Sequence, residues 1–342
     1  MDSRHGVQLV AGPVHSRQSA IKRVARRPSP VDVVEITLEA NPGTISHDKL
    51  RGFRAAGINR ISFGVQSFHP HHLRTLGRIH GRAEALEAVE LARQAGFTSV
   101  SMDLIFGLPD QTLSEWESDL TQACSLSPDH ISAYNLTYEE GTAFHLWRAH
   151  GRLRQLPEEI EVAMLTRTQE ILGAAGYQQY EISNYARSGF ACRHNLNYWR
   201  SGSYLGVGAG AHSHAARHSI VESRESNVRP APPEGQPWGC RWSNEKSPSG
   251  YLRAVAERGH ARVTSEALDA RQARAEFVFL GLRCCDGFAA AAFHERFGDE
   301  FPALFPHVSA LGEGGLLRCT DERWHLTPQG LLLADSVFVT FL

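Results

Sequence analysis

Residues 192–214 hold the densest group of side chains able to bind a ligand in this sequence. His194 offers an imidazole nitrogen that can coordinate a metal ion or the iron of a haem. Tyr198 and Trp199 add flat apolar rings with polar edges, and the glycines between 206 and 210 let the backbone approach another surface closely. Together these residue types favour a large flat ligand over a small polar one.

A second group of polar residues lies at the ends of predicted strands. From residue 31 onward, apolar β-branched runs alternate with helical stretches, which indicates a parallel sheet with right-handed crossovers. The predicted strands cover 33–40, 60–66, 99–106 and 130–136, and the predicted helices cover 46–56, 70–76, 82–95 and 113–126. The strands end in Glu39, Gln66, Asp103 and Asn135. Functional groups gather at the carboxyl ends of such strands, so we expect a shared site there, although each residue taken alone could cap a loop.

The pattern changes after residue 138. A helix is predicted over 156–175 and a strand over 177–183, and the Pro-, Gly- and Ser-rich stretch at 223–248 is typical of an exposed loop. The remainder alternates short helices with a short strand, as in a winged-helix-like domain. The expected fold class is α/β. The expected segments are a basic N-terminal segment at 1–30, a barrel at 31–150, a ligand-binding region at 151–222, a loop at 223–250 and a small C-terminal domain at 251–342.

Composition restricts the function. Of the 342 residues, 42% are hydrophobic and 21% are charged, and the formal net charge is -2. This balance is ordinary for a globular protein and argues against a surface built to bind nucleic-acid phosphates. The six cysteines are scattered without a Cys-x-x-Cys pair, which is typical of free thiols in a reducing compartment. We therefore expect a cytoplasmic protein.

Several motifs resemble those of one protein family, in the same order. They are EITLEANPG at 35–43, RISFGVQSF at 60–68, LGRIH at 76–80 and MDLIFGLP at 102–109. In these motifs the chain resembles the radical S-adenosylmethionine (SAM) proteins related to oxygen-independent coproporphyrinogen III oxidase. QQYEIS at 178–183 and HNLNYW at 194–199 are similar to the HemW branch of that family, the haem chaperones. The resemblance implies a partial (βα) barrel of the radical SAM type, missing its first strands, followed by an α+β region.

The resemblance also implies roles for residues at the strand ends. Glu39 and Gln66 match polar contacts to S-adenosylmethionine. Arg78 matches the residue that pairs with the methionyl carboxylate, as a guanidinium fork is suited to do. Asp103 matches the acid near the ribose hydroxyls.

For haem, the resemblance makes His194 the expected axial ligand of the iron, with Tyr198 and Trp199 against the macrocycle. The neighbouring arginines at 193 and 200 could meet the propionates. His212 and His214 are alternative ligands, and their His-x-His spacing could also bind zinc.

The sequence departs from the family at the iron–sulfur cluster. The family uses a Cys-x-x-x-Cys-x-x-Cys loop to hold a 4Fe–4S cluster and a Gly-Gly-Gly-Thr-Pro stretch near the cofactor. This sequence contains neither motif. We therefore expect no reductive cleavage of S-adenosylmethionine by the chain as given. A start placed too late and a natural loss of the cluster region would both explain the difference.

The predicted function is a haem chaperone that passes haem to acceptor proteins. One alternative is a truncated oxygen-independent coproporphyrinogen III oxidase of porphyrin biosynthesis. Another is a metal-dependent hydrolase that uses Asp103 with His130 or His212. The HNLNYW motif and the missing cluster motif favour the chaperone. The expected partners are haem and haem-acceptor proteins without nucleic acid, and weak membrane association through an acceptor and a homodimer are both compatible with the sequence.

Overall fold

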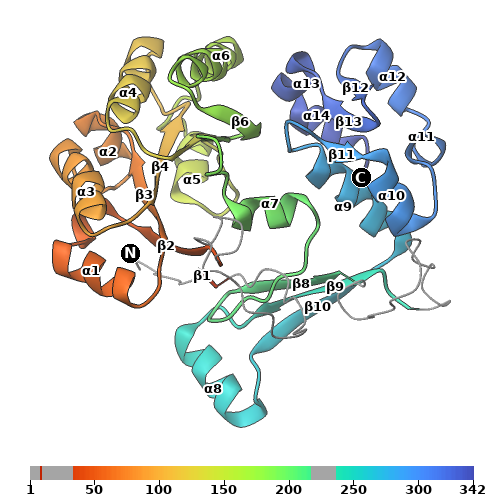
Figure 1. The fold of residues 1–342 in the computed structure, drawn as a ribbon, viewed down its shortest axis with the longest axis horizontal. Coiled ribbons are helices and arrows are strands. Elements are labelled where there is room, and N and C mark those ends of the chain that lie inside the picture. Colours follow the sequence, from red (N-terminus) through yellow and green to blue (C-terminus); the bar gives the residue numbers. More distant parts are fainter. Residues whose placement is uncertain (1–7, 10–33, 217–235) are drawn as a thin grey trace, which may run out of the picture. The chain divides into compact units, whose positions relative to one another are not determined.

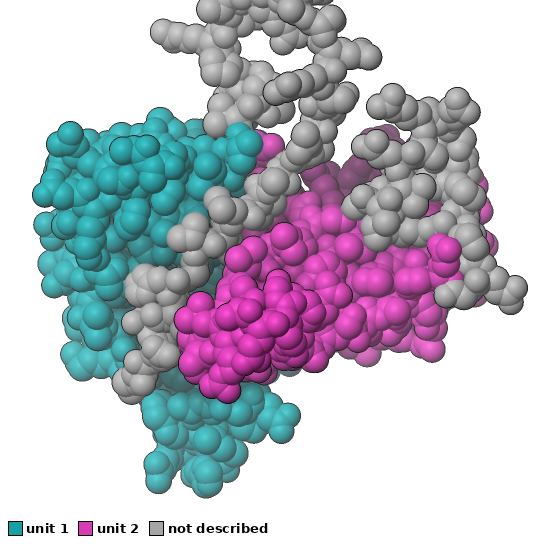
Figure 2. Space-filling model, turned by 90° about the horizontal axis from the view of Figure 1, so that it is seen from below, with its two compact units in different colours: residues 1–192 teal, residues 193–342 magenta. Residues whose placement is uncertain are grey.

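The computed structural model describes residues 8–9, 34–216 and 236–342 (Figure 1). The chain divides into two compact units, residues 1–192 and 193–342, which are coloured separately in Figure 2. Apart from residues 8–9, the predicted basic segment at 1–30 lies outside the described residues, as does the first part of the predicted loop, 223–235.

Unit 1 is built on a seven-stranded sheet in the order β1-β2-β3-β4-β5-β7-β6. Strands β2 to β5 are parallel neighbours, whereas β1 runs antiparallel to β2, and β7 runs antiparallel to both β5 and β6. Parallel strands in sequence order with helical connections are typical of part of a (βα) barrel. The strands are β1 (Gln8–Leu9), β2 (Ile36–Ala40), β3 (Arg60–Gln66), β4 (Ser99–Phe106), β5 (His130–Asn135), β6 (Gln178–Glu181) and β7 (Asn184–Ala186).

Helices cover one face of this sheet because alternate side chains of each strand are apolar. In β3, Ile61, Phe63 and Val65 have 0% exposed surface and belong to the core that the helices complete. Trp116 joins two helices of this core, α4 and α6, because its Nε1–H donates to Thr168 Oγ1 at 2.9 Å. The helices of unit 1 are α1 (His47–Ala55), α2 (Pro70–Thr75), α3 (Arg82–Gln94), α4 (Leu113–Ser125), α5 (Ala143–Ala149) and α6 (Glu158–Ala174), with a short 3-10 helix at Pro42–Thr44.

Unit 2 contains two antiparallel sheets, each of three strands, in the orders β10-β9-β8 and β11-β13-β12. Phenylalanine rings fill the core beside the second sheet, as in the pair Phe293 and Phe301, whose centroids are 5.7 Å apart. The strands are β8 (His212–Ala216), β9 (Gly239–Asn244), β10 (Arg262–Leu268), β11 (Phe288–Ala289), β12 (Leu317–Thr320) and β13 (Arg323–Leu326). The helices are α7 (Arg193–Trp199), α8 (Pro248–Arg258), α9 (Ala270–Gly281), α10 (Ala290–Phe297), α11 (Phe301–Leu304), α12 (Val308–Glu313), α13 (Pro328–Leu332) and α14 (Ala334–Val339).

The α/β class and the strands predicted at 60–66 and 99–106 are confirmed. Three details differ. Asp103 lies inside β4 and does not end it. The strand predicted at 177–183 is the shorter β6, and β7 follows it to complete a hairpin on the barrel sheet. Residues 239–244, predicted as loop, form β9, because pairing with β8 and β10 on both sides stabilises a strand that its Gly- and Ser-containing sequence does not reveal.

None of the helices in the described ranges has the length and apolar composition that crossing a bilayer requires.

Candidate functional site

The face of the unit 1 sheet opposite the helices, here called the inner face, carries polar side chains. They share this face because side chains alternate along a strand and the register places Ser62 beside Ser101 and Asp103 beside Ser132. Ser62, Ser101, Ser132 and Arg60 are each 5% exposed or less. Buried polar groups are unfavourable unless they are paired, so a face lined by them points to a binding site.

Asp103 is the acidic centre of the inner face. Ser62 Oγ donates to its two carboxylate oxygens at 3.2 and 3.1 Å, and Ser132 hydrogen bonds to the same carboxylate. Burial raises the pKa of Asp103 and the nearby Glu39 carboxylate raises it further, while the guanidinium of Arg60 acts in the opposite direction. A carboxylate in this position can accept hydrogen bonds from the hydroxyl groups of a ligand.

A second polar group lies where β2 and β3 end. Arg78 Nη1 donates to Asn41 Oδ1 at 3.2 Å, and burial lowers the pKa of Arg78 although the Asp103 carboxylate acts in the opposite direction. Gln66 has a φ of 69°, and its amide lies over Gly64, where an added Cβ would be 2.8 Å from Gln66 Nε2. Glycine at 64 therefore leaves the space that the amide occupies. Backbone strain of the kind seen at Gln66 is concentrated at binding and catalytic sites.

The structure brings the four residues expected to contact S-adenosylmethionine near one another. Glu39 and Arg78 both interact electrostatically with Asp103. Gln66 Nε2 and Asn41 Oδ1, which accepts from Arg78, both lie within 4 Å of the place that a Cβ on Gly64 would take. Their roles toward the cofactor stay predictions. Asn135, at the end of β5, instead donates from Nδ2 to Glu161 Oε2 at 2.9 Å.

Sequence reasoning missed a chain of polar groups at the start of the same strands. His130 is 1% exposed, and its Nδ1 and Nε2 lie 2.8 Å from Ser101 Oγ and 2.9 Å from Tyr180 Oη. Tyr180 Oη also accepts from the backbone N–H of Cys192 at 3.3 Å. Burial, with the charge of Arg60, holds the pKa of His130 well below its usual range. Both ring nitrogens of His130 have partners, which disfavours its predicted alternative role beside Asp103 in a metal-dependent hydrolase.

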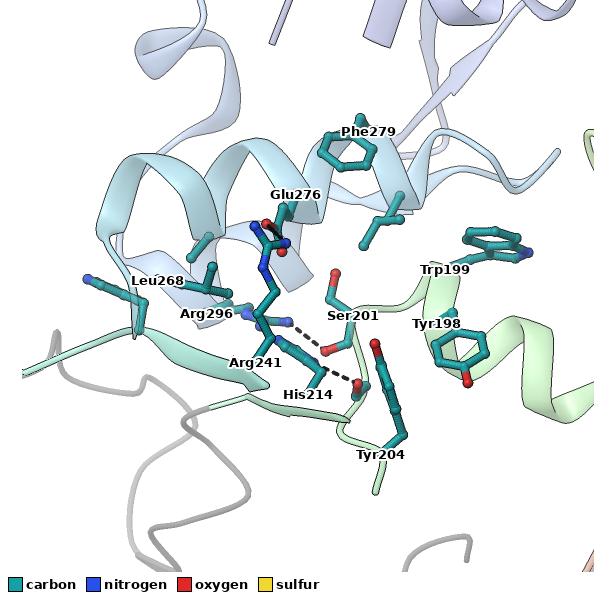
Figure 3. A pocket seen from close by; sticks show the side chains of 14 residues that line it. Tyr198, Trp199, Ser201, Tyr204, His214, Arg241, Leu268, Glu276, Phe279 and Arg296 are labelled. Atoms are coloured by element: carbon teal, nitrogen blue, oxygen red, sulfur yellow. Dashed lines mark hydrogen bonds and ion pairs between the residues drawn. The ribbon is translucent and has the colours of Figure 1, made fainter. Parts of the chain in front are cut away.

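Unit 2 contains a cavity of about 290 Å³ beside α7 (Figure 3). Its walls combine aromatic rings, which suit a flat ligand, with two arginines, of which Arg241 is paired at 2.7 Å with Glu266 and with Glu276, itself a lining residue. Tyr198, Trp199 and His214 were expected from the sequence, whereas the arginines come from elements far from α7 in the chain and were not. The residues that carry this character are Tyr198, Trp199, Tyr204, His214, Arg241 and Arg296.

A row of rings connects two of the predicted haem ligands. His194 is not among the residues that line the cavity, but it lies one helical turn before Tyr198 on α7, and the two rings meet edge to face at 4.6 Å. Tyr198 meets Tyr204 in the same way at 4.5 Å, and Tyr204 lies 5.9 Å from the ring of His214. His212, the other alternative ligand, is exposed.

His214 has a defined tautomer. Its Nδ1 lies 3.0 Å from the carbonyl oxygen of Gly202, which only accepts, so Nδ1 carries the proton and Nε2 carries the lone pair that a metal ion requires. Burial lowers the pKa of His214 and favours the neutral ring. Trp199, at the end of α7, packs under the guanidinium of Arg283 at 4.5 Å, and its buried Nε1 makes no hydrogen bond.

The cysteines do not form a cluster site. None of the six forms a disulfide, as the sequence predicted. Within the described part of the chain, the one group of three or more neighbouring metal-ligating side chains contains no cysteine. A 4Fe–4S cluster needs several thiolates at one place, so it does not fit the residues present.

Comparison with known proteins places the chain among proteins with a (βα) barrel of the radical SAM type. The model of the radical SAM superfamily matches residues 15–123, and that of the HemN C-terminal domain matches residues 268–333. The chain is 37% identical to the heme chaperone HemW of Bacillus subtilis, over 94% of this chain and 79% of that protein. It is 36% identical to the heme chaperone HemW of Escherichia coli, over 98% of this chain and 81% of that protein. Coproporphyrinogen III oxidase (HemN) from Escherichia coli has a similar fold, with a TM-score of 0.70 at 23% identity over 90% of this chain and 69% of that one.

The parallel sheet with its polar inner face and these matches define a radical SAM superfamily protein with a HemN-type C-terminal domain. Membership of that superfamily implies S-adenosylmethionine and an iron–sulfur cluster as the cofactors of the group. Within it, the relatives from Bacillus subtilis, Haemophilus influenzae and Escherichia coli, which match 94–98% of the chain at 36–37% identity, are named heme chaperone HemW. The chain belongs to the heme chaperone HemW family.

Proposed function

We propose that this chain binds haem and passes it to haem-acceptor proteins, as the name of its relatives describes for them. The observation that carries the proposal is the row of rings from His194 through Tyr198 and Tyr204 to His214. A haem carrier needs an axial ligand for the iron and flat apolar surface against the macrocycle, and this row supplies both.

His194 is the proposed axial ligand. It is partly exposed near the start of α7, so a large ligand can reach it, and its edge-to-face contact with Tyr198 orients the ring. Arg296 on the cavity wall supplies a cationic group for a propionate, whereas Arg241 is already paired with Glu266 and Glu276. His214 is the alternative ligand, because its Nε2 carries the lone pair.

The test is a haemin titration of the full chain followed by the Soret band. His194→Ala should abolish or strongly shift the band, whereas the matched control His325→Ala, which removes an imidazole from β13, should leave it unchanged. A shift confined to His214→Ala would transfer the ligand role to His214. A spectrum unchanged in both His194→Ala and His214→Ala would refute haem ligation by this row.

We further propose that the inner face of unit 1 binds S-adenosylmethionine. Support comes from membership of the superfamily, from Arg78 and Gln66 where β2 and β3 end, and from Asp103 on the inner face of β4. Removing a charge-assisted hydrogen bond costs about 1.5–3 kcal/mol, so Arg78→Ala should weaken binding by roughly 10- to 100-fold in isothermal titration calorimetry. The exposed Arg74→Ala on α2 is the matched control. Equal affinities for the two variants would contradict the assignment.

No reductive step is assigned to this site. In the superfamily, cleavage of S-adenosylmethionine takes an electron from the cluster, and the residues present do not fit a cluster. The proposed role of unit 1 is therefore limited to binding the cofactor.

A further inference from the structure

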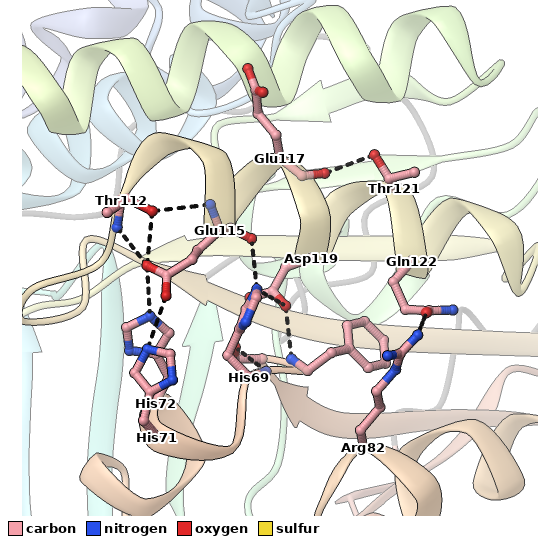
Figure 4. Close-up of polar contacts among 12 residues, drawn as sticks. His69, His71, His72, Arg82, Thr112, Glu115, Glu117, Asp119, Thr121 and Gln122 are labelled. Carbon is pink, nitrogen blue, oxygen red and sulfur yellow. Dashed lines mark hydrogen bonds and ion pairs between the residues drawn. The ribbon is translucent and has the colours of Figure 1, made fainter.

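Three side chains where α2 meets the start of α4 present ligand atoms to one another (Figure 4). One nitrogen of His71, one of His72 and one carboxylate oxygen of Glu115 all lie within 4.8 Å of each other. His71 Nε2 is 3.0 Å from Glu115 Oε1, and His72 Nε2 is 3.5 Å from Glu115 Oε2. The ligand atoms of a tetrahedral zinc ion bound at about 2.0–2.1 Å stand roughly 3.3 Å apart, and the two histidine-to-carboxylate distances are close to this spacing.

Burial of His72 separates this group from an ordinary surface ion pair. Its side chain is 1% exposed, and its Nε2 has no hydrogen-bond partner. Buried polar atoms in native proteins nearly always have a partner, so an unpaired imidazole nitrogen beside a carboxylate and a second imidazole needs an explanation. Coordination of an ion would provide the missing partner. His71, whose side chain is 51% exposed, gives the ion a path from solvent.

The local backbone fixes the three side chains in advance. Glu115 is the third residue of α4, and its Oε2 accepts from the N–H and the Oγ1 of Thr112, both at 2.9 Å. This capping box holds the carboxylate and leaves Oε1 turned toward His71. Pro70 opens α2 and restricts the backbone from which the two histidines project.

From this geometry we propose that His71, His72 and Glu115 bind one divalent transition-metal ion, with Zn²⁺ as the favoured ion. Two imidazoles and a carboxylate are ligands that Zn²⁺ accepts, and three protein ligands leave one position for water. Mg²⁺ and Ca²⁺ prefer oxygen ligands, so a set with two nitrogens disfavours them.

A bound ion would fasten α2 to α4. The segment between β3 and α2 is already held to α4, because Asp119 accepts from Ser67 Oγ at 2.7 Å and from Phe68 N at 2.8 Å. That segment starts directly after Gln66, the residue with positive φ. A bound ion would therefore restrict the motion of the backbone next to Gln66. The metal site does not depend on the proposed haem site, whose residues lie in unit 2.

The test measures Zn²⁺ affinity of the full, untagged chain after chelator treatment, by competition with a chromogenic chelator. Wild type should bind one Zn²⁺, and Glu115→Gln and His71→Ala should each lose about tenfold or more in affinity. Glu115→Gln is the sharper variant, because glutamine keeps the capping box while removing the carboxylate. His47→Ala is the matched control: its exposed imidazole also lies near a carboxylate, Asp48 at 4.0 Å, but has no second histidine, and its binding should equal wild type.

Two results would overturn the proposal. One is a wild-type affinity for Zn²⁺ that is no higher than the affinity of His71→Ala. The other is Zn²⁺ that binds equally well to wild type, Glu115→Gln and His71→Ala, which would place the ion elsewhere, for example at His212 and His214. Circular dichroism checks that each variant is folded, and if His71→Ala fails to fold, Glu115→Gln decides alone. Haem titration of Glu115→Gln should match wild type, so a failure of this site is distinguishable from a failure of the haem site.

Discussion

Asp103→Asn is expected to stabilise the ligand-free protein at neutral pH while weakening its binding of S-adenosylmethionine. Burial disfavours the ionised form of Asp103 and raises its pKa. This effect outweighs Arg60 and the serine hydroxyls, which stabilise the ionised carboxylate. Asparagine has the same shape, and its Oδ1 can still accept from Ser62, which lies 3.1–3.2 Å from the carboxylate oxygens. The change therefore removes a charge that the fold holds unfavourably and keeps most of the packing.

The sign of the effect follows from linkage between protonation and folding. Because the pKa of Asp103 is higher in the folded state than in the unfolded state, ionised Asp103 lowers stability at pH values above the folded-state pKa. That cost falls as pH decreases and is gone below the unfolded value of about 3.9. Asp103→Asn, which removes the ionisable group, should therefore raise the free energy of unfolding at neutral pH.

The assay is urea unfolding followed by circular dichroism at a series of pH values. The difference between Asp103→Asn and wild type should be largest at neutral pH and should shrink toward about pH 4. Asp110→Asn is the control, because Asp110 is exposed and its φ of 60° is one that asparagine accepts. Lower stability of Asp103→Asn at neutral pH, or a difference that does not change with pH, would refute this account of the inner face.

Two further predictions concern packing. Gly287→Ala should destabilise the C-terminal domain by more than about 2 kcal/mol in urea unfolding, because its Cβ would stand 1.8 Å from the carbonyl oxygen of Trp324 at a φ of 59°. Gly298→Ala, with a φ of 75° and open space around its Cβ, should cost only about 1 kcal/mol, and equal costs would contradict the clash. Trp116→Phe should lower the free energy of unfolding by about 1–3 kcal/mol, because it removes the buried hydrogen bond to Thr168 and leaves a void; a loss under about 0.5 kcal/mol would show that this bond contributes little.

Much of the barrel could be predicted because its sequence signals are local. The strand Arg60–Gln66 alternates apolar and polar residues, and a glycine, Gly96, follows shortly after the end of α3. These local patterns were enough to predict both elements. The position of Asp103 shows the limit. The sequence assigned it to a strand end, but only the register shows that it lies inside β4, opposite Gly64 of β3 and Ser132 of β5.

The polar groups that sequence reasoning missed depend on contacts between distant segments. His130 receives its partner Tyr180 from the β6–β7 hairpin, which no local pattern connects to β5. The adjacent histidines at 71 and 72 are visible in the sequence, but Glu115 comes from another helix and is brought to them by the fold. The haem-site arginines are likewise supplied by β9 and α10.

The positive φ of Gln66 leaves this position little mutational freedom. Side chains branched at Cβ are nearly excluded at a φ of 69°, whereas glycine and asparagine adopt it readily. Glycine would keep the backbone and lose the amide that lies over Gly64. Asparagine would keep an amide but shorten its reach by one methylene. Residue 66 must therefore meet two separate requirements, a backbone with positive φ and an amide side chain as long as that of glutamine. Neither glycine nor asparagine meets both.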